Sequence, residues 1–211
     1  MMDLRSLNTL AKFNIAVLIS GGGSNLQAII DQIENKQLNA HIGVVISDQV
    51  DAYGITRAQT AKITHHLVKA KPKETREQYD ARLTFLLEAQ PVDLIVLAGF
   101  MRILSAAFTK HFSRKIINLH PSLLPKYKGL NTHARAIDNQ ERYHGASVHF
   151  VTAGLDEGPV IIQEKVAIDS NESAQTLQIK VHAIEHRILP KAIKWLSEGR
   201  VSINDNAVVI T

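Results

Sequence analysis

Short apolar stretches alternate with segments of helical periodicity along the first part of the chain. Residues 14–20 form a nearly continuous apolar run that leads into the glycines of the string SGGGSN. Such a run is typical of a strand buried on both faces of a parallel sheet. Apolar residues between Leu26 and Ile33 then recur at the spacing of one helix face, and Ser24 or Asn25 is expected to cap this helix. The pattern predicts a strand, a glycine loop and a helix in succession.

The same alternation continues as far as His120. Thr75 and Gln78 have the spacing of a capping box, which marks the start of a helix. Further strands are expected over residues 41–47, 65–68, 93–100 and 115–120, and further helices over residues 52–62, from 75 and from 105. Strands that alternate with helices in this way predict an α/β fold with an open, mostly parallel twisted sheet covered on both faces.

The periodicity changes after His120, where prolines and a glycine interrupt the chain and predict an irregular segment. Two apolar stretches, residues 146–152 and 160–168, are close enough to pair antiparallel across the string LDEGP. A long helix is expected over residues 173–199, with Pro190 kinking it, and a small hairpin around residues 204–206. The sheet is therefore expected to have an antiparallel C-terminal portion.

Composition adds the expectation of one globular domain. The 211 residues are 45% hydrophobic and 21% charged, carry a formal charge of +4 and include no cysteine. We expect residues 13–211 to form that domain and residues 1–12 to be a loose N-terminal extension. Basic residues are interspersed with acidic ones, and no stretch reaches membrane-spanning length, so neither nucleic acid nor a membrane is an expected partner. We expect a cytoplasmic monomer or homodimer that acts on small molecules.

The glycine loop is the first candidate site. Glycines allow backbone N–H groups to approach an anion closely, and a helix N-terminus attracts negative charge. The loop lacks the Gly-Lys-Ser/Thr ending of a triphosphate-binding loop, and Leu26 stands where a dinucleotide fingerprint has its third glycine. From the residues alone, a phosphate site and a tight turn without a ligand both remain open.

The second candidate site combines Asn118, His120 and Asp156. Asn118 and His120 alternate on one face of a strand, close to its carboxyl end, where open α/β sheets bind ligands. An amide can donate to the oxygen of a tetrahedral intermediate, and an imidazole can donate to the same oxygen or transfer a proton. A carboxylate at Asp156 would favour the imidazolium if it faces His120. An ordinary hydrogen-bonded histidine and a solvated turn carboxylate are the alternatives.

A competing pattern lies in the C-terminal helix, where residues 182–186 match the H-x-x-E-H string of a zinc protease class. Two histidines at this spacing can share a metal, but a zinc site needs a third protein ligand and a cleft. Only Glu198 and Asp205 supply carboxylates downstream. His144 and His149 are likewise expected to be a loop and a strand residue. We therefore expect no metal site.

Five strings in order resemble the folate-dependent formyltransferase family, and within it the enzymes that formylate glycinamide ribonucleotide. They are SGGGSN, LAGFMRILS, NLHPSLLPKYKG, SVHFVTAGLDEGPVIIQ and a later EH. The resemblance implies a Rossmann-like formyltransferase fold. It also implies transfer of the formyl group of 10-formyltetrahydrofolate to the amino group of glycinamide ribonucleotide in de novo purine biosynthesis.

The resemblance implies a role for each candidate residue. Asn118 would stabilise the oxyanion, His120 would donate a proton, and Asp156 would raise the pKa of His120. Four residues would hold the ribonucleotide, the first three through its phosphate and the last through its sugar: Gly23, Ser24, Asn25 and Glu185. The folate would contact Arg76, Met101, Arg102, Ile103, Leu104, Asn118, Thr152, Ala153, Gly154, Leu155 and Asp156.

Three alternatives remain open. The chain could resemble a hydrolase of 10-formyltetrahydrofolate or a formyltransferase of another substrate, since these belong to the same superfamily. It could also be a non-catalytic ligand-binding domain, because a fold does not fix a function. Gly22 and His182 differ from the residues expected from the resemblance, and both lie beside the expected ribonucleotide site.

Overall fold

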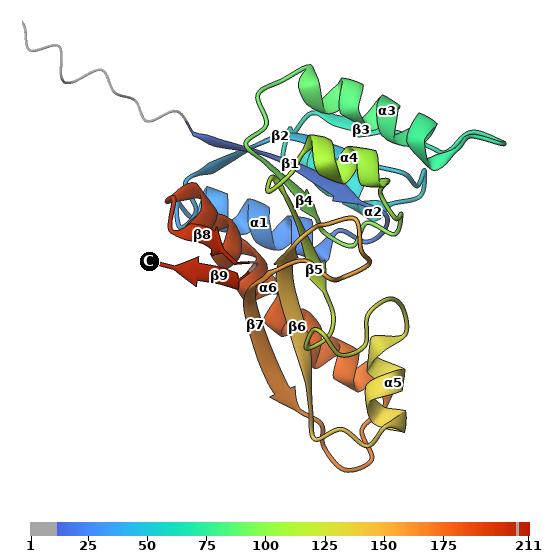
Figure 1. The fold of residues 1–211 in the computed structure, drawn as a ribbon, viewed down its shortest axis with the longest axis vertical. Helices are drawn as coiled ribbons and strands as arrows, with labels where there is room; N and C mark the ends of the chain where they lie inside the picture. The colour runs from blue at the N-terminus through green and yellow to red at the C-terminus, as the bar shows by residue number, and fades with distance from the viewer. Residues whose placement is uncertain (1–11, 206) are drawn as a thin grey trace, which may run out of the picture.

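The computed structural model describes residues 12–205 and 207–211. A seven-stranded sheet runs through the protein in the order β3-β2-β1-β4-β5-β6-β7 (Figure 1). Its strands are β1 (Phe13–Ile19), β2 (Ala40–Ser47), β3 (His65–Leu67), β4 (Leu94–Leu97), β5 (Ile116–His120), β6 (Tyr143–Phe150) and β7 (Val160–Ala167). The strands from β1 to β5 are parallel, whereas β6 pairs antiparallel with β5 and with β7. The predicted α/β class and its antiparallel C-terminal portion are confirmed.

The order of the strands places a crevice next to the middle of the sheet. Strand β1 pairs with β2 on one side and with β4 on the other. The chain therefore adds β2 and β3 on one side of β1 and then returns to add β4 and β5 on the other side. Ligands of open α/β sheets bind outside the carboxyl ends of strands at such a reversal. The glycine loop follows β1 at this edge.

Helices cover both faces of the sheet. They are α1 (Ser24–Glu34), α2 (Tyr53–Thr60), α3 (Arg76–Glu88), α4 (Ala106–His111), α5 (Thr132–Asp138) and α6 (Ala174–Ser197). Apolar residues of α1, α2 and α6 pack in one buried cluster with alternate residues of β1 and β4. Residues of α3 and α4 pack in the other cluster, with the intervening residues of the same strands. Alternation along each strand therefore supplies both cores.

Several local predictions are confirmed. Thr75 and Gln78 form the predicted capping box of α3, and the side chain of Ser105 caps α4. The C-terminal hairpin is formed by β8 (Val201–Asn204) and β9 (Ala207–Ile210). The predicted long helix is α6, which continues through the buried Pro190, and the kink at this proline stays a prediction.

Two local predictions were wrong, and one helix was not predicted. Helix α1 is capped by neither Ser24 nor Asn25: its N-cap is Gly23 in the left-handed conformation, with no side-chain hydrogen bond. The segment that Pro121, Pro125 and Gly129 interrupt has no helix or strand, as predicted, but the helix α5 that follows it was missed, because it is too short for a readable apolar period. Strand β6 begins at Tyr143 rather than at Ala146, because the pairing with β7 extends to Ala167.

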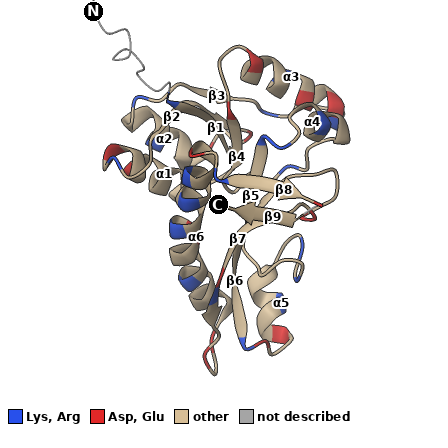
Figure 2. Ribbon diagram, turned by 60° about the vertical axis from the view of Figure 1, so that its left-hand side comes forward, with Lys and Arg blue, Asp and Glu red and all other residues tan. Residues whose placement is uncertain are grey.

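The N-terminal residues and the surface charges were also the subject of predictions. The expected loose extension, residues 1–12, lies outside the described residues except for Lys12. Lysine, arginine, aspartate and glutamate are distributed over many elements in Figure 2, with several basic residues along α6. Within the part of the chain that the structure describes, no helix is long and apolar enough to cross a membrane.

Candidate active site

A cavity of about 610 Å³ opens beside the carboxyl ends of β4 and β5. It is lined by residues 97, 99–104, 109, 118–121, 129–134, 149, 151–156, 174, 175 and 178. Many of these residues lie at the ends of the parallel strands β4 and β5 and in the loops that follow them, as expected for an open α/β sheet. Others come from α4, α5, α6 and the antiparallel strand β6. Every residue predicted to contact a folate lines this cavity except Arg76.

Asn118, His120 and Asp156 meet at the wall of the cavity. Strand β5 carries Asn118 and His120 on one face, and Asp156 lies in the loop between β6 and β7. The Asp156 carboxylate lies 3.4 Å from Nδ1 of His120 through one oxygen and 3.4 Å from Nδ2 of Asn118 through the other. The side chains of His120 and Asp156 are only 7% and 8% exposed. Residues 38 positions apart in sequence therefore form one nearly closed cluster.

The backbone conformation of Asp156 and a hydrogen bond from Gly129 fix the position of the Asp156 carboxylate. Asp156 has a left-handed backbone conformation, φ 52°, which non-glycine residues adopt rarely but which aspartate tolerates. The backbone N–H of Gly129 donates a hydrogen bond of 2.9 Å to its Oδ2. Although burial opposes ionisation, hydrogen bonds from His149 and Gly129 and the nearby imidazoles lower the pKa of Asp156 overall. The carboxylate is therefore ionised at neutral pH.

The pKa of His120 moves opposite to the expectation. Burial lowers the pKa of His120 below its ordinary value, and this effect outweighs the Tyr127 carbonyl and the charge of Asp156, which both raise it. Asp156 thus acts in the expected direction, but the expected net rise in the pKa of His120 is wrong. The Nε2–H of His120 donates to the carbonyl oxygen of Tyr127 at 2.9 Å, which leaves Nδ1 facing Asp156.

His149 is a member of this cluster that sequence reasoning did not assign to the site. It is 2% exposed and stands opposite Asn118 in the antiparallel pairing of β5 and β6. Its Nδ1 donates to the carbonyl oxygen of Phe150 at 2.8 Å, and its Nε2 lies 3.2 Å from Nδ2 of Asn118 and 3.6 Å from Oδ1 of Asp156. The strand register was the missing signal, because only the register places His149 next to Asn118.

The loop after β4 is anchored at both ends. The hydroxyl of Ser20 accepts from the backbone N–H of Met101 at 2.8 Å, and the guanidinium of Arg102 lies 4.0 Å from the centre of the Tyr79 ring. The backbone N–H of Ser105 donates to the buried carboxylate of Asp80 at 2.6 Å. This loop therefore presents its remaining backbone groups to the cavity from a fixed position, which suits a flat ligand.

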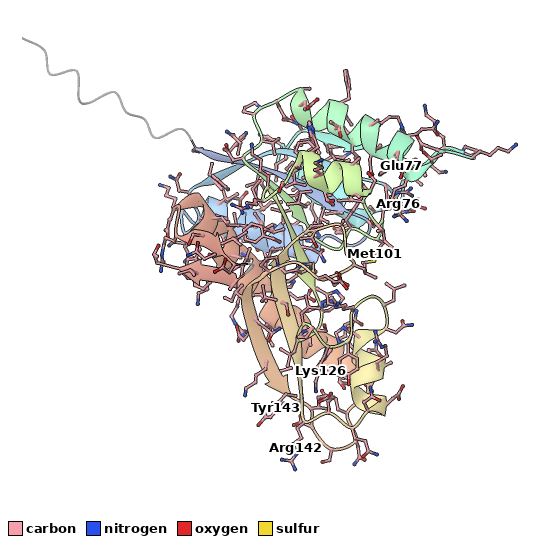
Figure 3. All side chains as sticks on the ribbon, in the orientation of Figure 1. Arg76, Glu77, Met101, Lys126, Arg142 and Tyr143 are labelled. Atoms are coloured by element: carbon pink, nitrogen blue, oxygen red, sulfur yellow. The ribbon has the colours of Figure 1, made fainter. Side chains whose placement is uncertain are left out.

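Arg76 lies apart from the other predicted folate residues. It is the first residue of α3 and does not line the cavity. Figure 3 shows it on the α3 side of the molecule, beyond Met101. Contact between Arg76 and a ligand therefore requires a ligand that extends out of the cavity past Met101, which is itself 67% exposed.

The predicted ribonucleotide residues form a second cluster next to the cavity. The backbone N–H of Ser20 donates to the carbonyl oxygen of Gly99 at 3.1 Å, which joins the glycine loop to the end of β4. Nδ2 of Asn25 donates to Glu185 at 2.9 Å, across 160 positions of sequence. Burial raises the pKa of Glu185, which is 4% exposed. Gly23, Ser24, Asn25 and Glu185 are thus brought together, although none of them lines the large cavity.

The H-x-x-E-H string does not assemble a metal site among residues 12–205 and 207–211. The rings of His182 and His186 lie one helical turn apart, with centroids separated by 6.4 Å. Between them, Glu185 accepts a hydrogen bond from the side chain of Asn25. Over the described part of the chain, no group of three or more histidine or acidic residues has the arrangement of a metal site.

The fold and the cluster of amide, imidazole and carboxylate at the strand ends define an α/β enzyme with an acyl-transfer type of site. Residues 13–193 match the formyl transferase family. The chain therefore belongs to the formyl transferase family.

Several similar proteins share its fold, and two phosphoribosylglycinamide formyltransferases share its size as well. The chain is 46% identical over 194 residues to phosphoribosylglycinamide formyltransferase of Escherichia coli (strain K12), covering 92% of both chains. A solved phosphoribosylglycinamide formyltransferase from Coxiella burnetii superposes with a TM-score of 0.90 at 46% identity, covering 94% of this chain and 93% of that one. A solved formyltetrahydrofolate deformylase from Pseudomonas syringae also has a TM-score of 0.90, but at 25% identity and with only 66% of that chain covered.

Proposed function

We propose that this enzyme transfers the formyl group of 10-formyltetrahydrofolate to the amino group of glycinamide ribonucleotide, a step of de novo purine biosynthesis. The observation that carries the proposal is the meeting of Asn118, His120 and Asp156 at one wall of the cavity. The identity to enzymes named for this substrate, over nearly their whole length, supports the choice of ribonucleotide.

The two substrates would enter from two sides of the cluster. The folate would lie in the cavity against residues 101–104 and 152–156, with Arg76 reaching the part of it that extends outward. The ribonucleotide phosphate would lie on the glycine loop, where the uncapped N-terminus of α1 attracts an anion and its first turn has no acidic residue. Glu185 would accept a hydrogen bond from the sugar. The amino group would then face the formyl carbon.

The reaction forms one C–N bond and breaks another. The substrate amine attacks the formyl carbon, and the formyl oxygen takes the negative charge of a tetrahedral intermediate. Asn118 and His120 would donate hydrogen bonds to this oxygen. His120 would take up the proton lost by the amine and would donate it to N10 of the folate, directly or through water, as the bond between N10 and carbon breaks.

The perturbed pKa values suit this sequence of events. Burial lowers the pKa of His120 and keeps this side chain neutral, whereas Asp156 is held ionised. An oxyanion beside His120 adds a second negative charge, which favours the imidazolium at the moment when a proton donor is needed. To donate to this oxygen, His120 must give up either its hydrogen bond to the Tyr127 carbonyl or its contact with Asp156.

One assay separates this function from its alternatives. The protein is incubated with 10-formyl-5,8-dideazafolate, a stable analogue of the folate, with and without glycinamide ribonucleotide, and deformylation is followed by absorbance. The proposal predicts deformylation only when the ribonucleotide is present. Deformylation without it would indicate a hydrolase, and no reaction in either mixture would indicate a binding protein.

A further inference from the structure

Helix α2 packs directly against the glycine loop, although no residue of α2 has a role in the proposed mechanism. The backbone N–H of Gly54 donates to the carbonyl oxygen of Gly21 at 3.1 Å. A Cβ atom on Gly23 would lie 2.6 Å from Cα of Gly54, so the two backbones are in contact. This approach requires glycine at both positions.

Arg57, one turn further along α2, binds the next carbonyl of the loop. Its Nε donates to the carbonyl oxygen of Gly22 at 2.9 Å, and one of its terminal nitrogens donates to Oε1 of Gln27 at 3.0 Å. The Tyr53 ring lies below its guanidinium, 5.0 Å from centroid to carbon. Arg57 thus links the loop, α1 and α2 through a rigid fork of donors.

These contacts fix the direction of the loop amides. In a planar trans peptide the C=O and the following N–H point to opposite sides. Because the carbonyls of Gly21 and Gly22 point toward α2, the N–H groups of Gly22 and Gly23 point away from it. Neither N–H group has a hydrogen-bond partner among the described residues. They are therefore free to bind an anion in front of the N-terminus of α1.

We propose that α2 is a clamp for the glycine loop and that Arg57 is the residue that positions the loop amides for the substrate phosphate. The proposal rests on the function proposed above and adds a residue that the sequence patterns did not indicate. Arg57 acts through the geometry of the loop, so a lysine at the same position would keep the charge and lose the fork.

The test compares Arg57→Met and Arg57→Lys with wild type. Arg142→Met is the matched control, because Arg142 is an exposed arginine of the loop before β6, at the opposite end of the molecule (Figure 3). We expect both Arg57 variants to raise KM for glycinamide ribonucleotide about tenfold, the scale of one lost charge-assisted hydrogen bond. KM for the folate analogue and kcat stay within about twofold of wild type, and the control matches wild type. A purely structural role would instead lower the melting temperature without a selective change in KM.

A second measurement does not depend on formyl transfer. Inorganic phosphate is titrated into wild type and both variants by calorimetry, and its dissociation constant is expected to rise by a similar factor in both Arg57 variants. An unchanged phosphate affinity in Arg57→Met overturns the clamp even if the protein proves inactive toward glycinamide ribonucleotide. Full recovery of wild-type KM in Arg57→Lys overturns it as well, because charge alone would then suffice.

Discussion

Replacing Asp156 with asparagine removes one negative charge from a nearly closed pocket while it keeps the size of the side chain. In the folded protein this charge lies 3.4 Å from Nδ1 of His120. Two unit charges at this separation attract each other by about 5 kcal/mol at an effective dielectric constant of about 20. The asparagine variant loses this attraction at the step in which His120 becomes an imidazolium.

The expected loss is therefore large for the reaction. About 1.4 kcal/mol corresponds to one factor of ten in rate, and acid–base groups contribute roughly 10²-fold to 10⁴-fold. We expect kcat/KM of Asp156→Asn to fall within that range. Folding stability changes by less than about 2 kcal/mol, because the asparagine oxygen can still accept from Gly129 and the cost of burying a charge disappears.

The assay combines initial rates of formyl transfer with urea unfolding of the same preparations at pH 7. Asp138→Asn is the control, since Asp138 is exposed at the end of α5 and outside the cavity. A rate for Asp156→Asn within tenfold of wild type would refute the reasoning. So would a loss of activity that follows the loss of folded protein.

Three further predictions concern other parts of the chain. Burial lowers the pKa of His133 from 6.5 to about 4, so between these pH values the unfolded chain takes up a proton that the folded protein does not. The contribution of His133 to the free energy of unfolding is therefore full above about pH 6.5 and decreases toward pH 4. Urea unfolding of His133→Asn should show a smaller decrease in stability over this range. Glu185→Gln is expected to raise KM for the ribonucleotide with little change in melting temperature, and a raised KM for the folate analogue alone would contradict the assigned role. Gly145→Ala is expected to unfold at a lower temperature by several degrees, because its Cβ would collide with the Glu164 carbonyl, and an unchanged melting curve would contradict this packing.

The sequence sufficed to predict the sheet and half of the residue cluster at the cavity wall. Buried parallel strands have near-continuous apolar runs, so their positions could be read directly. Asn118 and His120 lie on one strand, where the alternation of side chains fixes their common face. The position of Asp156 could be expected only from the resemblance, because a loop of the β6–β7 connection must fold back over β5 to bring it there.

The remaining parts of the site depend on tertiary packing that has no local signal. His149 faces Asn118 only through the register of β6 on β5. The glycine at the start of α1 replaces the predicted side-chain cap, and the reason lies in its contact with Gly54 of another helix. The pKa of His120 depends on how deeply the side chain is buried, which the spacing of residues does not reveal.

The central claim is that one formyl carbon passes from a folate nitrogen to the amino group of glycinamide ribonucleotide in this site. Its most direct test uses 10-formyltetrahydrofolate labelled with ¹³C in the formyl group and follows the label by NMR. The account predicts that wild type moves the label into a formamide on the ribonucleotide, and that His120→Ala does so far more slowly. Label that appears as free formate at the same rate with and without ribonucleotide would contradict it.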